Sequence, residues 1–343
     1  MARPVSVNVA EIATRANVST ASVSRVLNNQ RGVSETLRSH IRTILESDGK
    51  YTLHVSERGV KVAVIIEMDE PHVSTYISSL LTGIADYALH NKVDISTVFV
   101  PSHEKTPTDI LGIIRERRCD GVIPLFSSTL PDSELRKLVK AKVAVMVVNG
   151  PCDHPSAGYL YTDPDAGMTL LLTHLAQLGH CNIAYLAGPQ AGDYDNSQRA
   201  QVFLKHLEAA GHPNSRELLV LHQPTRSAQE AGYLQAMTIL RRCPNITAMI
   251  ANNDEMAYGA MLACHEAKRS VPRDISVVGF DDYPNSQYTI PPLTTIRLHL
   301  SDVGYQAIQA VHQHACGTLA TLPRRVLKPE LIVRGSTASI SRS

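Results

Sequence analysis

The spacing of hydrophobic and polar residues changes after about residue 60 of the chain. Before that point, apolar residues recur at helical spacing in three short runs, each preceded by a polar residue that can cap a helix. Beyond it, short apolar runs rich in β-branched residues alternate with longer helical patterns. The pattern predicts a small helical head followed by an α/β body.

The first predicted helix covers about residues 9–16. Asn8 is its cap, and Glu11, three residues later, completes a capping box. Asn17 can adopt the left-handed conformation that closes a helix. These signals place a short helix at the start of the head and a tight turn directly after it.

Two further helices follow this turn. Ser19 is the expected cap of a helix over about 20–28, which has one apolar stripe made of Val23, Val26 and Leu27. Ser34 opens a third helix, whose inward residues are Leu37, Ile41, Ile44 and Leu45. Two short helices joined by a tight turn, with a third behind them, are the plan of a helix-turn-helix DNA-binding head. A plain three-helix bundle with a polar surface is the alternative.

The second helix carries suitable chemistry for DNA. Its short Ser and Thr hydroxyls can reach phosphate oxygens without pushing a helix out of the major groove. Arg25 is its one long cation, and a guanidinium can bond both O6 and N7 of a guanine.

The body alternates strand and helix twice over. Strands are expected near 61–66, 94–100, 119–126, 143–148, 183–187, 218–221, 247–251 and 275–279. Helices are expected near 74–91, 107–118, 132–141, 164–179, 195–211, 226–241 and 254–269. Such alternation predicts parallel sheets covered by helices on both faces, here as two similar lobes. Ligands of such sheets bind at the carboxyl ends of the strands, in this case in the cleft between the lobes.

Composition and charge narrow the class of protein. The 343 residues carry a net charge of +1, of which residues 1–60 hold +3. A basic head on a slightly acidic body is compatible with DNA binding. No secretory signal or membrane-spanning run is visible. Six scattered cysteines without a C-x-x-C pair indicate reduced thiols in a cytoplasm, and we expect no metal and no cofactor.

The head resembles a known family. The stretch "NVAEIATRANVSTASVSRVLN" (8–28) and the later "VSETLR" (33–38) are similar to the N-terminal signature of the lactose-repressor/galactose-repressor family of bacterial transcription regulators. The resemblance implies base reading by Thr20, Ala21 and Arg25. It implies phosphate contacts from Asn8, Ser19, Ser22, Ser24 and Asn28. Ala21 is too short to hydrogen-bond a base and can touch only a thymine methyl.

The segment after the head departs from the family pattern. Relatives carry a Pro and an A-R-x-L core that becomes a hinge helix, whose leucine wedges into the minor groove. Here the text is "YTLHVSERGVKVAVII", with Leu53 in place of the proline and about six residues fewer before Val62. Leu53 or Val55 is the candidate wedge of a shortened hinge over 51–60. The head is then 1–50, and the body is 61–343.

The body resembles the same family, whose core is shared with periplasmic sugar-binding proteins. The matching stretches are "TDPDAGMTLLLTHLAQLGHCNIAYLAGP" (162–189), "NNDEMAYGAMLA" (252–263), "ISVVGFDDYPNSQYTIPPLTTI" (275–296) and "LKPELIVRGST" (327–337). The resemblance implies three crossings between the lobes. Lobe 1 is then about 61–161 and 294–322, and lobe 2 about 162–291 and 326–336.

Polar residues at expected strand ends match family positions that contact an effector. These are Arg199, Asn253 and Asp281, which suit a sugar diol because a carboxylate accepts and a guanidinium donates paired bonds. A salt bridge across the lobes is the alternative for Arg199 and Asp281. Further candidates for the lining of the cleft are Tyr76, Ser127, Asn149, Asp193 and Asp195. The two acids at 193 and 195 favour an uncharged polyhydroxyl effector, a sugar, glycoside or nucleoside.

The sequence therefore predicts a homodimeric DNA-binding regulator, a repressor, that binds a near-palindromic operator and is controlled by a sugar-like effector. Two heads are needed because a bidentate base contact discriminates by only about 1–3 kcal/mol. No membrane partner is expected. An enzyme is disfavoured because no G-x-S-x-G, H-E-x-x-H, P-loop or dinucleotide motif is present. A solute-binding receptor with a vestigial head is the remaining alternative.

Overall fold

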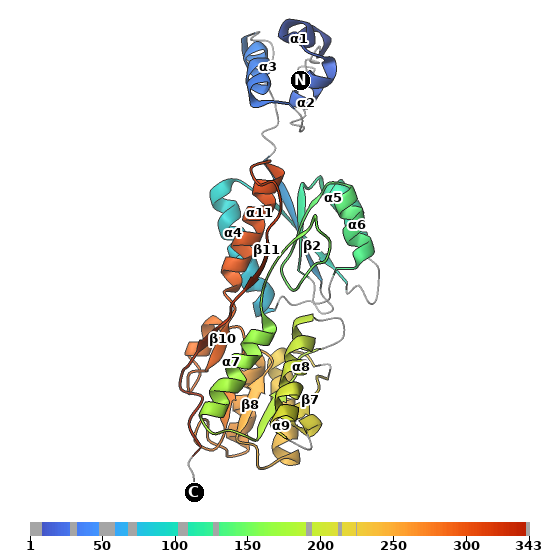
Figure 1. Cartoon of the computed structure of the whole chain (residues 1–343). Helices are drawn as coiled ribbons and strands as arrows, with labels where there is room; N and C mark the ends of the chain where they lie inside the picture. The colour runs from blue at the N-terminus through green and yellow to red at the C-terminus, as the bar shows by residue number, and fades with distance from the viewer. Residues whose placement is uncertain are drawn as a thin grey trace. The chain divides into compact units, whose positions relative to one another are not determined.

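The structure is a computed structural model, in which the described residues are 9–27, 33–47, 59–67, 74–101, 109–125, 130–189, 194–211, 215–223 and 225–340. The chain folds as two units, the head (1–59) and the body (60–343). Among the described residues, three helices form the head, and two α/β lobes form the body (Figure 1).

The head has the three predicted helices, α1 (Val9–Ala16), α2 (Thr20–Leu27) and α3 (Glu35–Ser47). Asn17 ends the first with a φ of 54°, as predicted. The Ser19 hydroxyl accepts a hydrogen bond from the Ser22 amide at 3.1 Å, which satisfies one of the unpaired donors at the start of α2. All three helices share one small buried core, made of Ile12, Ala13, Ala16, Val23, Val26 and Ile41.

Lobe 1 is built on a six-stranded parallel sheet in the order β11-β5-β4-β3-β1-β2. Its strands are β1 (Lys61–Glu67), β2 (Asp94–Val100), β3 (Gly121–Leu125), β4 (Ala144–Val147), β5 (Gly158–Thr162) and β11 (Arg324–Leu327). Successive residues of β1 point to opposite faces, so Val62 and Val64 pack on one side and Ala63 and Ile65 on the other.

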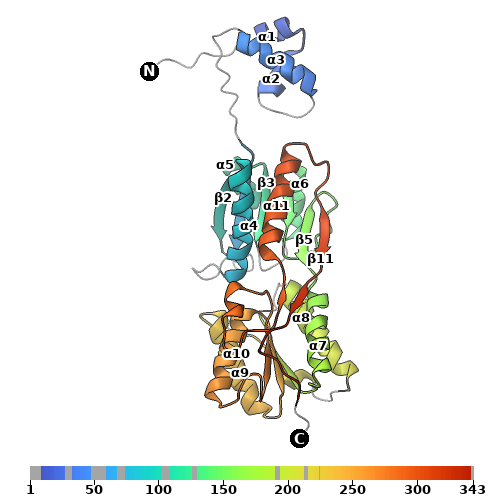
Figure 2. The ribbon, with the colours of Figure 1, turned by 90° about the vertical axis from the view of Figure 1, so that its left-hand side faces the viewer.

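Helices cover both faces of this sheet. One face carries α4 (Thr75–Asn91) and α11 (Leu300–Ala315), which lie side by side (Figure 2). These two helices approach closely because Gly83 and Gly304 lack side chains; a Cβ on Gly304 would lie 2.1 Å from the Leu80 carbonyl oxygen. The other face packs against α5 (Ile110–Arg117) and α6 (Asp132–Lys140).

Lobe 2 repeats the plan on a four-stranded parallel sheet in the order β7-β6-β8-β9. Its strands are β6 (Ile183–Leu186), β7 (Leu219–Val220), β8 (Ala248–Ala251) and β9 (Ser276–Val278). One face packs against α7 (Pro164–Gln177) and α8 (Tyr194–Ala209), and the other against α9 (Ala228–Arg242) and α10 (Asp254–Glu266). Two 3-10 turns, at Ser215–Leu218 and Pro284–Gln287, complete the lobe.

The chain crosses between the lobes three times. The first crossing joins β5 to α7, and the other two run through β10 (Thr295–Arg297) and β12 (Glu330–Ile332), which pair antiparallel. The last return to lobe 2 follows Leu327, because β11 completes the sheet of lobe 1. Both sheets therefore turn the carboxyl ends of their strands toward the crossings.

The structure contains each of the helices and strands predicted by periodicity in the body, to within a few residues at each end. The alternation pattern does not predict β5, β10, β11, β12 or α11. Over the residues described, no helix has the length and apolar character needed to cross a membrane. Over the same residues, no cluster of His, Cys, Asp and Glu side chains is arranged to hold a metal ion.

Candidate functional site

One face of α2 is buried and the opposite face is exposed. Val23 and Val26 lie in the core of the head. Thr20, Ala21 and Arg25, the three predicted base readers, are all exposed. A short helix anchored by two valines therefore presents its only cation to solvent, as a helix that enters a major groove must.

The predicted phosphate-contacting residues divide into two groups. Ser19 is exposed and Ser22 partly buried, and their hydroxyl oxygens lie 2.9 Å apart, so one hydroxyl donates to the other and the accepting hydroxyl keeps its own hydrogen for a phosphate. Asn8, Asn28 and the hinge residues Leu53 and Val55 lie outside the described residues, and so does the side chain of Ser24.

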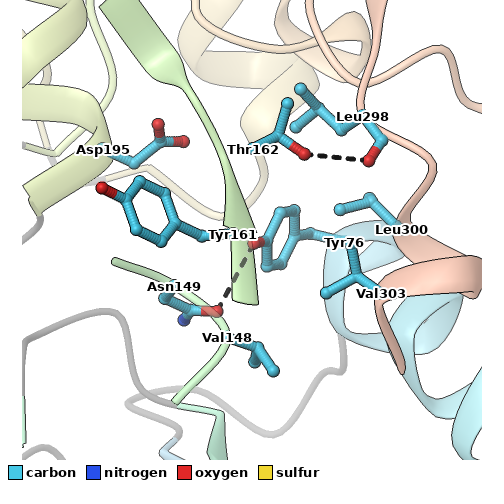
Figure 3. Close-up of a pocket in the computed structure, with 9 residues that line it drawn as sticks. All are labelled: Tyr76, Val148, Asn149, Tyr161, Thr162, Asp195, Leu298, Leu300 and Val303. Carbon is cyan, nitrogen blue, oxygen red and sulfur yellow. Dashed lines mark hydrogen bonds between the residues drawn. The ribbon is translucent and has the colours of Figure 1, made fainter. Parts of the chain in front are cut away.

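A pocket lies between the lobes, at the carboxyl ends of β4 and β5 (Figure 3). Its residues come from lobe 1, from two of the crossings and from lobe 2, and they are Tyr76, Val148, Asn149, Tyr161, Thr162, Asp195, Leu298, Leu300 and Val303. The Tyr76 hydroxyl donates to Asn149 Oδ1 at 3.4 Å. Three of the predicted lining residues, Tyr76, Asn149 and Asp195, thus share one pocket.

Arg199 occupies the lobe 2 side of this cleft and is only 4% exposed. Its guanidinium donates to the Asp195 carboxylate, one turn earlier on α8, and to the Asn252 carbonyl oxygen that follows β8. Its carbon Cζ also lies 4.2 Å from the centre of the Phe280 ring. The cation is therefore fixed by a carboxylate, a strand end and an aromatic face.

Asp281 lies beside this guanidinium and is 6% exposed. Burial raises its pKa well above the ordinary value of an aspartate, and the nearby Arg199 charge opposes that shift. The side chain of Asp281 forms a hydrogen bond with the Tyr283 hydroxyl. Its Oδ1 atom is buried and has no hydrogen-bond partner among the residues that the structure describes. Such an atom is costly to bury and needs a donor from water or a ligand.

The remaining predicted effector residues are less informative. Asn253 is the cap of α10, where its Oδ1 accepts from the Met256 amide at 2.9 Å, so its amide nitrogen is the part available to a ligand. Ser127 and Asp193 lie outside the described residues.

The sequence patterns do not indicate several residues of this region. Tyr161 ends β5 in the pocket, next to the Tyr194 ring, and belongs to a strand that the alternation pattern does not predict. At the carboxyl edge of lobe 2, buried Gln235 donates to the Ala187 carbonyl at 3.1 Å but leaves its Oε1 without a described partner. His222, just after β7, likewise has a buried Nδ1 without one. Their only sequence signal is a polar side chain close to a strand end.

Asp254 is a fully buried carboxylate beside the cleft. It accepts hydrogen bonds from the Tyr283 amide at 2.7 Å, from the Ser286 hydroxyl at 2.5 Å and from the Thr295 hydroxyl. These donors lie on the segment that follows Asp281 and on the second crossing. Burial raises the pKa of Asp254 to about 7, although the three hydrogen bonds favour its charged form.

Two family models match the chain. The first, described as bacterial regulatory proteins of the lacI family, matches residues 8–49, and the second, a periplasmic binding protein-like domain, matches residues 172–337. The transcriptional regulator MalR of Streptomyces coelicolor is 30% identical over 344 residues, which is 96% of each chain.

Two solved structures are similar over nearly the whole chain. The lac repressor dimer bound to operator and the anti-inducer ONPF is 26% identical, with a TM-score of 0.68, and covers 97% of this chain and 99% of its own. The complex of the regulator CelR with cellobiose shares the fold at 24% identity, with a TM-score of 0.67 and coverage of 96% and 100%.

We predict different effects for two substitutions of Asp254. Asp254→Ala removes the acceptor of three buried donors and should lower the free energy of unfolding by at least about 1–3 kcal/mol. Asp254→Asn can keep these contacts, because the two hydroxyls can rotate, and should cost much less. Urea unfolding at fixed pH measures both; equal losses for the two variants would contradict the described network.

The same Asp254 variants test how the free energy of unfolding depends on pH. Because the pKa of Asp254 is higher in the folded protein than in an unfolded chain, the folded state binds more protons between about pH 4 and 7. The wild type should therefore lose this contribution to stability as the pH rises through that interval. Asp254→Asn should show a correspondingly flatter dependence.

Proposed function

The chain belongs to the lacI family of bacterial regulatory proteins, and we propose that it is a repressor controlled by a small sugar-like effector. It is a DNA-binding transcriptional regulator with an effector-binding domain, not an enzyme. The proposal adds the sign of regulation, the class of effector, the homodimer and the residues that act.

The exposed face of α2 supports the proposed mode of operator recognition. Thr20, Ala21 and Arg25 are exposed on the side opposite the buried valines, and Ser19 and Ser22 lie where hydroxyls can reach phosphates. In this proposal Arg25 reads a guanine, and a near-palindromic site provides one such contact for each head. A regulator of bacterial genes would act in the cytoplasm.

Arg25→Ala should weaken operator binding by about 1–3 kcal/mol for each half-site and leave effector binding unchanged. Gel shift on the DNA upstream of its gene measures the first, and calorimetry the second. His40→Ala, an exposed position on α3, is the matched control and should bind DNA as the wild type does. Unchanged operator affinity in Arg25→Ala would refute the assignment.

The same gel shift separates the two candidate functions. A solute-binding receptor with a vestigial head would leave the DNA unshifted at any protein concentration. The exposed guanidinium of Arg25 on a well-packed head favours the regulator.

The polar groups of the cleft support an uncharged, hydroxyl-rich effector. Arg199 already pairs with the Asp195 carboxylate, so an anionic group of an effector would meet a compensated cation and a nearby acid. Asp281 Oδ1 offers a buried acceptor to a hydroxyl donor. Tyr76 and Tyr161 add aromatic rings that suit the apolar face of a sugar. A complex of the similar regulator CelR contains cellobiose, a neutral sugar.

Asp281→Asn should weaken effector binding by about 2- to 10-fold, equivalent to about 0.5–1.5 kcal/mol for a hydrogen bond. The effector is first identified by thermal shift with neutral mono- and disaccharides, nucleosides and sugar phosphates, and affinities are then measured by calorimetry. Asp274→Asn, at the opposite edge of lobe 2, is the control. Binding of a sugar phosphate but not of the free sugar would overturn the proposed class.

Exposed apolar residues support a homodimer. Leu89 on α4 is 81% exposed, Phe99 on the edge strand β2 is 58% exposed, and Ile290 in lobe 2 is 96% exposed. Each of these side chains would be removed from water if a second chain covered it. The lac repressor, a similar protein, is a dimer in its operator complex.

Phe99→Glu should shift the chain toward monomer by placing a charge in the proposed interface. Sedimentation equilibrium measures the shift at micromolar concentration. Leu170→Glu, an exposed apolar position on α7, is the control and should not change the mass. A wild type that sediments as a monomer at all accessible concentrations would contradict the homodimer.

In the proposed mechanism, effector binding changes the angle between the lobes and so alters the spacing of the two heads of the dimer. An effector that prefers the DNA-free form weakens operator binding by the same factor by which DNA weakens effector binding. Whether the effector releases or reinforces the repressor is then decided by measuring its affinity with and without operator.

A further inference from the structure

The amino edge of the lobe 1 sheet, where its strands begin, carries a row of exposed cations. We define the cationic edge as Lys92, Arg115, Arg117, Arg118, Lys140 and Lys142, which end α4, α5 and α6 or follow them directly. These helices lead into β2, β3 and β4. Because β4, β3, β1 and β2 are neighbours in the sheet, the cations form one row at one edge.

Three turns of this edge place a cation where the backbone favours glycine. Lys92, Arg118 and Lys142 all have left-handed backbones, with φ of 54°, 53° and 60°. In lobe 2 the turns that end α7 and α8 have glycines at this position, and the turn after α10 has a lysine. A helix dipole attracts cations to any helix end, so it does not explain why all three turns are cationic in lobe 1.

The side chains of the cationic edge face solvent. All six are exposed, and none makes an ion pair or side-chain hydrogen bond within the described part of the chain. Two nearby acids are engaged elsewhere: Asp94 lies 3.4 Å from the Lys61 ammonium, and Asp120 accepts the Lys61 amide at 2.9 Å. Asp94, Asp120 and Glu116 are the exposed acids nearest in sequence to these six cations.

The corresponding arginines of lobe 2 bond to protein atoms. Arg269 donates to the carbonyl oxygens of Pro244, Ile246 and Asp274, and Arg242 donates to that of Glu217. These side chains hold turns in place. The cations of lobe 1 have no such structural task and remain available to an anionic partner.

The chain itself connects the cationic edge to a DNA-binding head. The chain enters lobe 1 at this edge, at the start of β1, and residues 48–58 link it to α3. Even fully extended, this link spans only about 40 Å. The length of this link therefore limits the separation between the start of β1 and the end of α3 to about 40 Å.

We propose that the cationic edge of lobe 1 binds the phosphate backbone of duplex DNA. Four neighbouring strands about 4.8 Å apart give a row about 15 Å long, and duplex DNA carries one phosphate charge per about 1.7 Å of its axis. The contacts are independent of sequence and add to base reading by the head. They extend the surface that holds this regulator on DNA from α2 to its effector-binding body.

The test compares two triple variants of the full chain. Lys92→Asn, Arg118→Asn and Lys142→Asn together remove three charges, and asparagine tolerates the left-handed backbone, so folding should be kept. The control combines Arg216→Gln, Arg241→Gln and Lys268→Asn, which removes three exposed charges from lobe 2, one of them left-handed with φ of 58°. Thermal melting confirms that both variants fold.

Binding to a fluorescent duplex of about 60 base pairs of random sequence is followed by anisotropy between about 50 and 200 mM KCl. The slope of log K against log salt should flatten by about 0.9 for each phosphate that the variant chain no longer neutralises. For the lobe 1 variant, the slope should therefore flatten by two to three times this amount. The slope for the control should match that of the wild type. For Arg118→Asn alone, the slope should flatten by about 0.9.

Equal slopes for the wild type and the lobe 1 variant would overturn the proposal. So would equal flattening in the control, because it would show a general effect of net charge. A weakening confined to single-stranded RNA of the same length would assign the cationic edge to RNA instead. If Arg25→Ala loses operator recognition but keeps the steep slope of log K against log salt, base reading by the head and phosphate binding by the cationic edge act separately.

Discussion

The buried carboxylate of Asp282 holds together two of the three crossings on which the body depends. It lies 2.7 Å from Arg297 on the second crossing and 2.6 Å from Arg334 after the third, and it is itself almost inaccessible. One acid shared between two arginines fixes the antiparallel pair β10 and β12. Because both lobes attach to this pair, the width of the cleft between them depends on how rigidly these strands are held.

Other contacts also join the two lobes. Thr75 at the start of α4 donates to Glu255 at the start of α10 with a distance of 2.6 Å, which joins lobe 1 directly to lobe 2. On the crossing side, Asp254 ties the segment after Asp281 to β10. The two lobes are thus joined both by the crossings and by the Thr75–Glu255 hydrogen bond. Changes in lobe angle are expected to break the latter first.

The sequence predicted local structure well, because local signals decide it. Asn17 closes α1 and Ser19 caps α2 as predicted, and Val23 and Val26 of the α2 stripe are buried. The elements that were not predicted depend on distant partners. β11 is exposed along most of its length and is a strand only because β5 lies beside it, and β10 exists through its pairing with β12.

The residues of the candidate site also divide into those that local sequence signals predict and those that depend on tertiary packing. Arg199, Asp195 and Asp281 could be chosen because they stand at expected strand and helix ends, and the structure brings them together. Their roles toward an effector remain predictions. Gln235 and Asp254 could not be chosen, since one lies in the middle of a pattern typical of a buried helix and the other resembles an ordinary first-turn acid. Their importance comes from tertiary burial, which no local pattern encodes.

The anchoring of Arg199 has a consequence for selectivity. The Arg199 guanidinium already pairs with the Asp195 carboxylate, so its charge is compensated before any effector binds. Binding energy in this cleft must then come mainly from filling the vacant acceptor of Asp281 and from burying apolar ligand surface. Two sugars that differ in one hydroxyl at that acceptor would differ far more in affinity than two that differ beside the arginine.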